Sequence, residues 1–293
     1  MSSISRRRML KSTIAGTALA SSPMSWGQEK AQAPAENPTP RKGNIKQSVS
    51  RWCYPKMTLD ELCAYSAQIG LKGVDLLEVA EWETPKKYGL ICTMGYGGGG
   101  SIPDGLNVIA NHDKIVQGLT ASIPLAAKAG VPNVITFSGN RRGMPDEEGA
   151  KNTIIGLNRI KKIAEDNNVV VNLELLNSKV NHKDYMADHT AWGVAVMKEV
   201  NSPHVKLLYD IYHMQIMEGD LIATIQQNIQ WLGHFHTGGV PGRHELNNTQ
   251  EVQWDGVMRG IVASGFKGYV AHEFVPTGDP RASLLQAVDL CDV

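Results

Sequence analysis

The stretch LLYDIYHMQ, residues 207–215, decides how the rest of the chain is interpreted. It begins as an apolar and aromatic run typical of a β-strand, and then places Asp210 and His213 where a buried core would continue. An Asp at the end of a strand often opens a turn. It can also belong to a functional site, so the deciding question is whether other strands of this chain end in the same way.

Strand-like runs recur along the chain and alternate with amphipathic stretches that have the period of helices. The clearest helix begins at Thr58, which forms a capping-box pattern with Glu61, and it ends near Gly70. Helical patterns also cover residues 145–168 and 184–201. The eight strand candidates are residues 47–53, 73–78, 90–94, 133–137, 169–175, 205–210, 231–236 and 269–274.

This alternation predicts an α/β protein with one domain, a (β/α)8 TIM barrel, because each crossover helix makes consecutive strands parallel. A chain of 293 residues has an ordinary length for such a barrel. A doubly wound open sheet is the alternative, but it would have fewer strands. It would also carry a GxGxxG pattern after its first strand, and this sequence has none there.

A run of glycines, YGGGGS at residues 96–101, follows the third strand candidate. Such a run can hold a phosphate on its backbone amides. A P-loop is excluded because no Gly-Lys-Ser or Gly-Lys-Thr follows the glycines. We therefore expect this run to form a mobile loop over the mouth of the barrel.

The last four strand candidates all end in polar side chains, spaced by about one βα unit. These side chains are Glu174, Asp210, His236 and Glu273. In a barrel, polar residues at the C-terminal ends of strands point into the active site. Three carboxylates that close together would repel one another unless a cation neutralised them. Oxygen-rich ligands with one imidazole suit Mn²⁺ or Mg²⁺, with Co²⁺ or Zn²⁺ as further candidates, so one divalent metal ion is predicted.

The segments around these residues resemble the hydroxypyruvate isomerase group of the xylose-isomerase-like barrels, a superfamily of sugar phosphate isomerases and epimerases. The resemblance covers nearly all of residues 45–293, and DIYHMQIMEGDL (210–221) carries it most specifically. The other segments that carry it are VNLELLNSKVNHKDYMAD (171–188), HFHTGGVPGRHE (234–245) and HEF (272–274).

The resemblance implies an aldose–ketose type isomerase that moves a proton between adjacent carbons of a small hydroxy-carbonyl substrate through an enediolate. Hydroxypyruvate to tartronate semialdehyde is the named reaction. By the same resemblance, Glu174 and Glu273 are both metal ligands and the catalytic proton-transfer pair, while Asp210 and His236 complete the ligand set. The chemistry is consistent with the residues themselves, because carboxylates can carry protons beside a Lewis-acidic metal.

Three further residues are candidates for substrate binding. His213, one turn after Asp210, resembles the family's contact to a substrate oxygen, with a capping or core histidine as the alternative. Arg243 can pair with a substrate carboxylate, as hydroxypyruvate would require, with a solvated loop arginine as the alternative. Glu78 ends the second strand candidate and is a candidate substrate contact there.

Other residues near the strand ends are expected to be structural. We expect His234 to point away from the site because it alternates with His236 along the strand. We expect the same structural role for His272, which precedes Glu273. Three aromatic residues are expected either to wall the substrate pocket or to pack in the core: Trp52, Tyr54 and Trp82.

The resemblance leaves the substrate open. Hydroxypyruvate isomerases of this family tend to have Gln at the position of His236, whereas its ketose 3-epimerases have His. Residues 1–27 also have the layout of an export signal, and export is unusual for an enzyme of glyoxylate metabolism. A ketose 3-epimerase or keto-sugar isomerase is therefore the alternative in the same class. In another class, a non-catalytic exported sugar-binding protein is the alternative, although binding alone does not require both Glu174 and Glu273.

The N-terminal residues 1–27 have the layout of an export signal, with arginines, a short apolar stretch and the small-residue pattern Ala18-Leu19-Ala20. The arginines at SRRRMLK (5–11) resemble a twin-arginine signal, which predicts a periplasmic protein. The apolar stretch is too short to span a bilayer. Residues 28–44 are expected to form a Pro-rich disordered linker, and residues 45–293 the isomerase domain.

The charge balance bears on the partners of the protein. The chain has 29 basic and 29 acidic residues, so it lacks the positive charge that nucleic acids or anionic membranes attract, and a nuclease is disfavoured. The expected partner is a small hydroxy-carbonyl or sugar substrate, with no membrane insertion, and a homo-oligomer is left open. The four cysteines form no CxxC pair. We expect buried free thiols, with a disulfide between Cys63 and Cys291 as the alternative.

Overall fold

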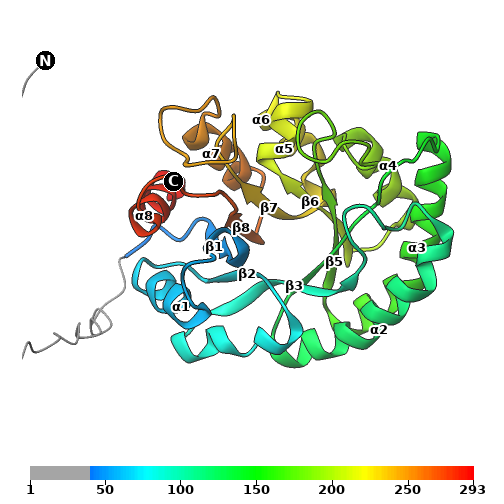
Figure 1. Cartoon of the computed structure of the whole chain (residues 1–293), viewed down its shortest axis with the longest axis horizontal. Helices are drawn as coiled ribbons and strands as arrows, with labels where there is room; N and C mark the ends of the chain where they lie inside the picture. The colour runs from blue at the N-terminus through cyan, green and yellow to red at the C-terminus, as the bar shows by residue number, and fades with distance from the viewer. Residues whose placement is uncertain (1–39) are drawn as a thin grey trace, which may run out of the picture. The chain divides into compact units, whose positions relative to one another are not determined.

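The strands of the chain close into a barrel in the computed structural model, which describes residues 40–293 (Figure 1). All neighbouring strands are parallel, and the first strand pairs with the last. The predicted TIM barrel is therefore confirmed. The strands are β1 (Lys46–Ser50), β2 (Gly73–Leu77), β3 (Ile91–Gly99), β4 (Asn133–Thr136), β5 (Val170–Leu175), β6 (Val205–Asp210), β7 (Leu232–Thr237) and β8 (Tyr269–His272).

Helices surround the barrel and make the crossovers between the strands (Figure 1). The α-helices are α1 (Leu59–Gln68), α2 (His112–Ala129), α3 (Asp146–Asn167), α4 (Thr190–Val200), α5 (Ile211–Met217), α6 (Leu221–Asn228), α7 (Trp254–Ala263) and α8 (Pro280–Cys291). Between β2 and β3 the crossover contains two 3₁₀ helices, η2 (Val79–Glu81) and η3 (Thr84–Tyr88), instead of an α-helix. The other 3₁₀ turns of the described residues are η1 (Arg51–Cys53), η4 (Ile109–Asn111) and η5 (Ile229–Trp231).

Helix α1 begins at the capping box that the sequence predicts. The hydroxyl of Thr58 accepts a hydrogen bond from the Glu61 backbone N–H at 3.2 Å. The carboxylate of Glu61 in return accepts one from the Thr58 N–H at 2.7 Å. This reciprocal capping box satisfies two backbone donors that the first turn of a helix leaves free. Both halves of the expected pattern are therefore confirmed.

The glycine run at residues 96–101 is largely part of a strand, so the expected mobile loop is wrong for its first four residues. Strand β3 continues to Gly99, whose carbonyl accepts a hydrogen bond from the Thr136 hydroxyl at 2.7 Å. A Cβ on Gly99 would lie 2.2 Å from the Ile135 carbonyl oxygen. Glycine is needed here because β3 and β4 approach each other closely, and a larger residue would force their backbones apart.

Strand β2 is irregular around Asp75. Its register with β3 shifts on both sides of Asp75. The next residue, Leu76, has a backbone φ of 57°, in the left-handed region that a bulky side chain rarely adopts. Irregularities of this kind re-aim side chains next to active sites. Asp75 is fully buried and contacts β7, which is not a neighbour of β2, so its side chain points into the barrel interior.

The two ends of the described chain lie together at the amino end of the barrel. The Asn44 side chain donates a hydrogen bond to the Val293 carbonyl at 2.9 Å, and the Lys42 N–H donates to Asp292. Arg41 forms an ion pair with Asp289. The C-terminal end of the predicted linker therefore packs on the domain. The predicted export signal (1–27) lies outside the described residues.

Two other expectations concern the cysteines and membranes. All four cysteines are buried and free, so Cys63 and Cys291 form no disulfide. Burial raises the pKa of the Cys63 thiol to about 12, as expected for an inert core thiol. Among residues 40–293, no helix combines the length and the hydropathy required to cross a bilayer.

Glu245 fixes the segment that follows β8. Its carboxylate accepts hydrogen bonds from the Thr277 N–H at 2.7 Å, the Thr277 hydroxyl at 2.8 Å and the Ser283 hydroxyl at 3.0 Å. Burial opposes ionisation of Glu245, but these donors, together with the N–H of Gly278, lower its pKa to about 2. The charged carboxylate therefore stabilises the folded state more than the unfolded state.

We expect Glu245→Gln to lower the free energy of unfolding at pH 7 by about 1–2 kcal/mol, allowing for solvent screening near the surface. The folded pKa lies below the usual value, so this contribution is present above about pH 4.5 and is lost as the pH falls toward 2. Urea unfolding of both proteins from pH 7 to pH 3 tests this. A gap between wild type and variant that does not narrow with falling pH would contradict it.

Candidate metal centre and active site

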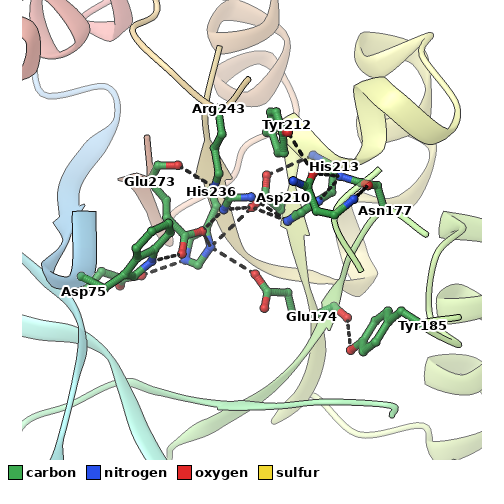
Figure 2. Close-up of polar contacts among 12 residues, drawn as sticks. Asp75, Glu174, Asn177, Tyr185, Asp210, Tyr212, His213, His236, Arg243 and Glu273 are labelled. Carbon is green, nitrogen blue, oxygen red and sulfur yellow. Dashed lines mark hydrogen bonds and ion pairs between the residues drawn. The ribbon is translucent and has the colours of Figure 1, made fainter. Parts of the chain in front are cut away.

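Four buried side chains converge at the carboxyl-end rim of the barrel, and we call them the tetrad. Each side chain comes from the end of a different strand, from β5 to β8. The members are Glu174, Asp210, His236 and Glu273. One ligand-type atom from each lies within 4.8 Å of the others (Figure 2). The structure therefore brings together the four residues that the sequence analysis selected.

His236 lies in the middle of the tetrad (Figure 2). Its Nδ1 atom is 2.6 Å from Glu273 Oε2, 3.4 Å from Glu174 Oε1 and 3.9 Å from Asp210 Oδ2. Nδ1 is buried and forms no well-aligned hydrogen bond within residues 40–293. The opposite nitrogen, Nε2, lies 2.8 Å from an oxygen of Asp75. The Nε2 atom of the imidazole is thus in contact with Asp75, and its Nδ1 atom points toward the three carboxylates of the tetrad.

The surroundings of the two glutamates differ. Burial raises the pKa of Glu174 to about 7, with added repulsion from Glu273. Burial also acts on Glu273, but the positive charges of Arg243 and His236 outweigh it and lower its pKa to about 2. Burial raises the pKa of Asp210 as well. Two carboxyl groups whose environments separate their pKa values are typical of proton-transfer sites.

The donors of the tetrad fit a divalent metal ion. Three carboxylates and one imidazole give an oxygen-rich set of the kind that Mn²⁺ and Mg²⁺ prefer. Once it has lost its proton, Nδ1 of His236 would supply a lone pair directed at the same point as the carboxylates. A cation there would also remove the repulsion between the three buried carboxylates.

Arg243 lies in the site and not in solvent. One guanidinium nitrogen donates to Asp210 Oδ2 at 2.5 Å and also contacts Glu273 Oε2. Another lies 2.6 Å from Nε2 of His213. The guanidinium also stacks over the Tyr212 ring, with its central carbon 4.9 Å from the ring centroid. The alternative of a solvated loop arginine is therefore wrong.

Asp210 and His213 answer the question raised by the stretch at 207–215. The Asp210 carboxylate accepts a hydrogen bond from the His213 backbone N–H at 3.3 Å and so caps α5. The same carboxylate belongs to the tetrad. The His213 ring is buried, with Nδ1 2.6 Å from the Asn177 amide and Nε2 beside Arg243. The turn and the site are thus made by the same two residues.

Of the four other residues considered for the substrate pocket, Glu78 and three aromatic residues, only Trp52 contacts the tetrad in the described structure. Glu78 is exposed at the end of β2, where it caps η2, and no described contact links it to the tetrad. Trp52 is 45% exposed, and its indole N–H donates to Glu273 Oε1 at 2.5 Å, so it borders the site. Tyr54 packs on Phe274, with ring centroids 6.4 Å apart. Trp82 is buried and donates to a backbone carbonyl, which makes it a core residue.

The expected orientation of His234 is wrong. Residues two apart on a strand lie on the same face, so His234 and His236 point the same way. Their rings lie 5.2 Å apart, and His234 Nε2 is 3.3 Å from Asp75 Oδ1. His272 does have structural contacts, with Gln47 at 2.8 Å and Thr237 at 3.1 Å. Burial lowers the pKa of His272 to about 3.

Asp75 is the residue of this site that the sequence analysis missed. It is fully buried in β2 and lies beside both histidines of β7. Burial disfavours its charge, but His234 and His236 outweigh this and hold its pKa below the usual range. An Asp inside an otherwise apolar strand, GVDLL, was the available signal, because a buried carboxylate needs a polar or charged partner.

Comparison with known proteins places this site in context. The profile of the family described as "Xylose isomerase-like TIM barrel" matches residues 84–291. The chain belongs to the xylose isomerase-like TIM barrel family. Curated proteins that are similar to parts of this chain are named 2-oxo-tetronate isomerase, hydroxypyruvate isomerase and D-psicose 3-epimerase.

The curated relatives within this family match parts of the chain. Hydroxypyruvate isomerase of Escherichia coli K12 is 34% identical over 113 residues, which cover 38% of this chain and 43% of that protein. D-psicose 3-epimerase of Agrobacterium fabrum is 33% identical over 128 residues, covering 42% and 41%. The human relative, whose name also refers to hydroxypyruvate isomerase, is 26% identical over 168 residues. That match spans 56% of this chain and 61% of the human protein.

Several solved structures share the fold of this chain. 3-Keto-D-glucoside 4-epimerase of Escherichia coli has a TM-score of 0.70 at 20% identity, covering 83% of this chain and 97% of that chain. D-psicose 3-epimerase of Clostridium cellulolyticum, solved with D-tagatose, has a TM-score of 0.64 at 19% identity, covering 83% and 90%. An AP endonuclease of family 2 from Brucella melitensis has 0.74 at 20%, covering 82% and 97%. At these identities the likeness concerns the fold alone.

Proposed function

We propose that the chain is a divalent-metal-dependent isomerase that moves a proton between adjacent carbons of a small hydroxy-carbonyl substrate. The proposed reaction converts hydroxypyruvate to tartronate semialdehyde through an enediolate. The observation that carries this proposal is the tetrad, in which the buried side chains of two glutamates, an aspartate and a histidine bring their ligand-type atoms close together. A binding protein would have no need for two carboxylates with separated pKa values at that point.

Each residue has a distinct task in this reaction. Glu174, Asp210, His236 and Glu273 would hold the metal, which when bound supplies Lewis-acid stabilisation of negative charge on the substrate oxygens. Glu174 and Glu273 come from the ends of β5 and β8, which are separated by β6 and β7, and they would act at two different positions of the substrate. One takes a proton from the hydroxyl-bearing carbon, C3, and the other returns a proton at the former carbonyl carbon, C2, while the hydroxyl proton passes from the C3 oxygen to the C2 oxygen.

The substrate proposal depends on Arg243. Its guanidinium lies at the tetrad and is held by Asp210, His213 and the backbone carbonyl of Glu273. Its described partners, with Glu273 Oε2, take four of the five guanidinium N–H groups, so a substrate carboxylate would pair through two hydrogen bonds by displacing one of these partners. Hydroxypyruvate carries such a carboxylate next to its carbonyl carbon. Trp52, which donates its indole N–H to Glu273 and is partly exposed, borders the same site.

A ketose 3-epimerase is the second candidate, and His236 is the observation that favours it. By the resemblance described in the sequence analysis, His236 corresponds to the ligand position at which ketose 3-epimerases have His. D-psicose 3-epimerases are also among the named relatives and solved structures. The same pair of glutamates would then remove and return a proton at one carbon. An uncharged ketose would leave Arg243 to contact hydroxyl oxygens.

Deuterium exchange separates these reactions. The full chain, stripped of metal and reloaded with Mn²⁺ or Mg²⁺, is incubated in D₂O with hydroxypyruvate and, separately, with fructose. We expect metal-dependent deuterium in hydroxypyruvate and the appearance of tartronate semialdehyde, both followed by NMR of the metal-free filtrate. Exchange in fructose alone would favour the epimerase. The absence of exchange in both would favour a sugar-binding protein, and a metal-free sample controls for spontaneous enolisation.

A further inference from the structure

Asp75 is a fully buried carboxylate that the proposed reaction does not use. Its Oδ1 accepts a hydrogen bond from the Thr93 hydroxyl at 2.6 Å and lies 3.3 Å from His234 Nε2. Its Oδ2 lies 2.8 Å from His236 Nε2. Barrel interiors are filled mainly by branched apolar residues, and a buried carboxylate is costly without partners. Its presence between the two histidines therefore calls for an explanation.

The backbone is shaped to bring Asp75 to this place. The register shifts that flank Asp75 and the left-handed φ of Leu76 interrupt a strand that is otherwise fully buried. Such strain persists where the surrounding structure enforces it, commonly at functional sites. The interruption lets the side chain reach across the interior to β7, a strand that does not pair with β2. The backbone irregularity and the burial of the Asp75 carboxylate thus both favour its contact with His236.

We propose that Asp75 is a positioning residue that acts through His236. An ionised carboxylate only accepts hydrogen bonds, so its oxygen keeps a proton on Nε2 of His236. The lone pair of a neutral ring is then on Nδ1, the atom that faces Glu174, Asp210 and Glu273. This inference rests on the proposed function, because it makes Asp75 the partner that orients one metal ligand.

Thr93 and His234 hold Asp75 in this orientation. Both lie at Oδ1, the oxygen that His236 does not contact, so the carboxylate cannot rotate freely. The ring of His234 stands at 88° to that of His236 and packs against its edge. The orientation of His236 is therefore fixed from the barrel interior, while its Nδ1 remains available at the mouth.

The same three side chains, Asp75, His234 and His236, lie close enough together to hold a cation of their own. We favour positioning because the 2.6 Å and 2.8 Å contacts of Asp75 are ordinary hydrogen bonds, already complete without an ion. The two arrangements predict different stoichiometries. One Mn²⁺ per chain is expected, and two Mn²⁺ ions, of which Asp75→Asn removes one, would overturn the proposal.

The test compares Asp75→Asn with Thr93→Val in the full chain, using Mn²⁺ alone as the probe. Both changes keep the side-chain volume nearly constant and alter the surroundings of the same carboxylate. Calorimetry should show that Asp75→Asn weakens Mn²⁺ binding about 10- to 100-fold. Thr93→Val removes one of the two partners of Oδ1 but keeps the contacts of Asp75 with His234 and His236, so it should weaken binding by no more than about threefold. Equal losses in two folded variants would indicate a general packing effect and would overturn the proposal.

A second measurement needs no Asp75 variant. Long-range ¹H–¹⁵N spectra of histidine-labelled wild-type chain report which ring nitrogens carry protons, with His236 assigned by comparison with His236→Gln. We expect a proton on Nε2 both without metal and with diamagnetic Zn²⁺. A bare Nε2 with a proton on Nδ1 would overturn the proposal. If wild type binds no Mn²⁺, the proposed function fails, while the metal-free spectrum still decides the role of Asp75.

Discussion

Replacing Glu273 with Gln is expected to lower kcat/KM by at least about 10³-fold while the protein remains folded. The amide has nearly the same size as the carboxylate, and its oxygen can still accept the Trp52 indole N–H. It cannot, however, accept a proton from carbon, and it removes one negative charge from the tetrad. Turnover of the substrate identified by deuterium exchange gives the effect. Circular dichroism and thermal unfolding show whether the fold is retained.

Because Glu273 has two roles, the metal content of the variant must be measured as well. Loss of activity with Mn²⁺ still bound would assign the effect to proton transfer, whereas loss of both would assign it to ligation. Glu251→Gln is the matched control, since Glu251 is exposed in the loop after β7 and should leave activity unchanged. Full activity of Glu273→Gln would refute the proton-transfer role.

Arg243→Ala should separate charged from uncharged substrates. Hydrogen bonds to charged groups contribute about 1.5–3 kcal/mol, so the KM for hydroxypyruvate should rise roughly 10- to 150-fold. A neutral ketose cannot form the paired contact with a guanidinium, and its KM should change much less. The variant also removes a partner of Asp210 and Glu273, so kcat should fall for any substrate that is turned over. Steady-state kinetics with both substrates measure the two effects.

Two further variants sharpen this comparison. Arg243→Lys keeps the charge but loses the planar fork, so it should recover only part of the affinity for hydroxypyruvate. Arg142→Ala removes an exposed arginine that pairs with Asp104 and should have little effect on either substrate. If Arg243→Ala raised the KM of hydroxypyruvate and of the ketose equally, the carboxylate contact would be ruled out.

Most of the fold could be predicted from the sequence because its signals are local. The strand candidates 73–78 and 205–210 match β2 and β6 to within one residue, since apolar runs between turn residues define them. The crossover after β2 was less predictable, because two 3₁₀ helices replace an α-helix there. The glycine run was misinterpreted because glycine permits loops and also permits the close approach of two strands, as at Gly99.

The site could be predicted only where strand ends reveal it. Glu174 and Asp210 are the last polar residues of their strands, and closure of the barrel brings them to one rim. Asp75 lies within its strand, and its partners come from β7, on the other side of the interior. No local pattern contains that contact. The error at His234 had a different cause. Residues two apart on a strand point to the same side, but the prediction placed His234 and His236 on opposite sides.

The closeness of Asn44 to Val293 has a practical consequence for handling the protein. Both ends of residues 40–293 leave the barrel on the side opposite the tetrad, since all strands run toward the rim. A purification tag, a surface linker or a carrier protein attached at either end would therefore leave the mouth open to substrate. The two ends could also be joined by a short peptide, and new ends opened in a crossover on the outer surface, without cutting any strand that carries a tetrad residue.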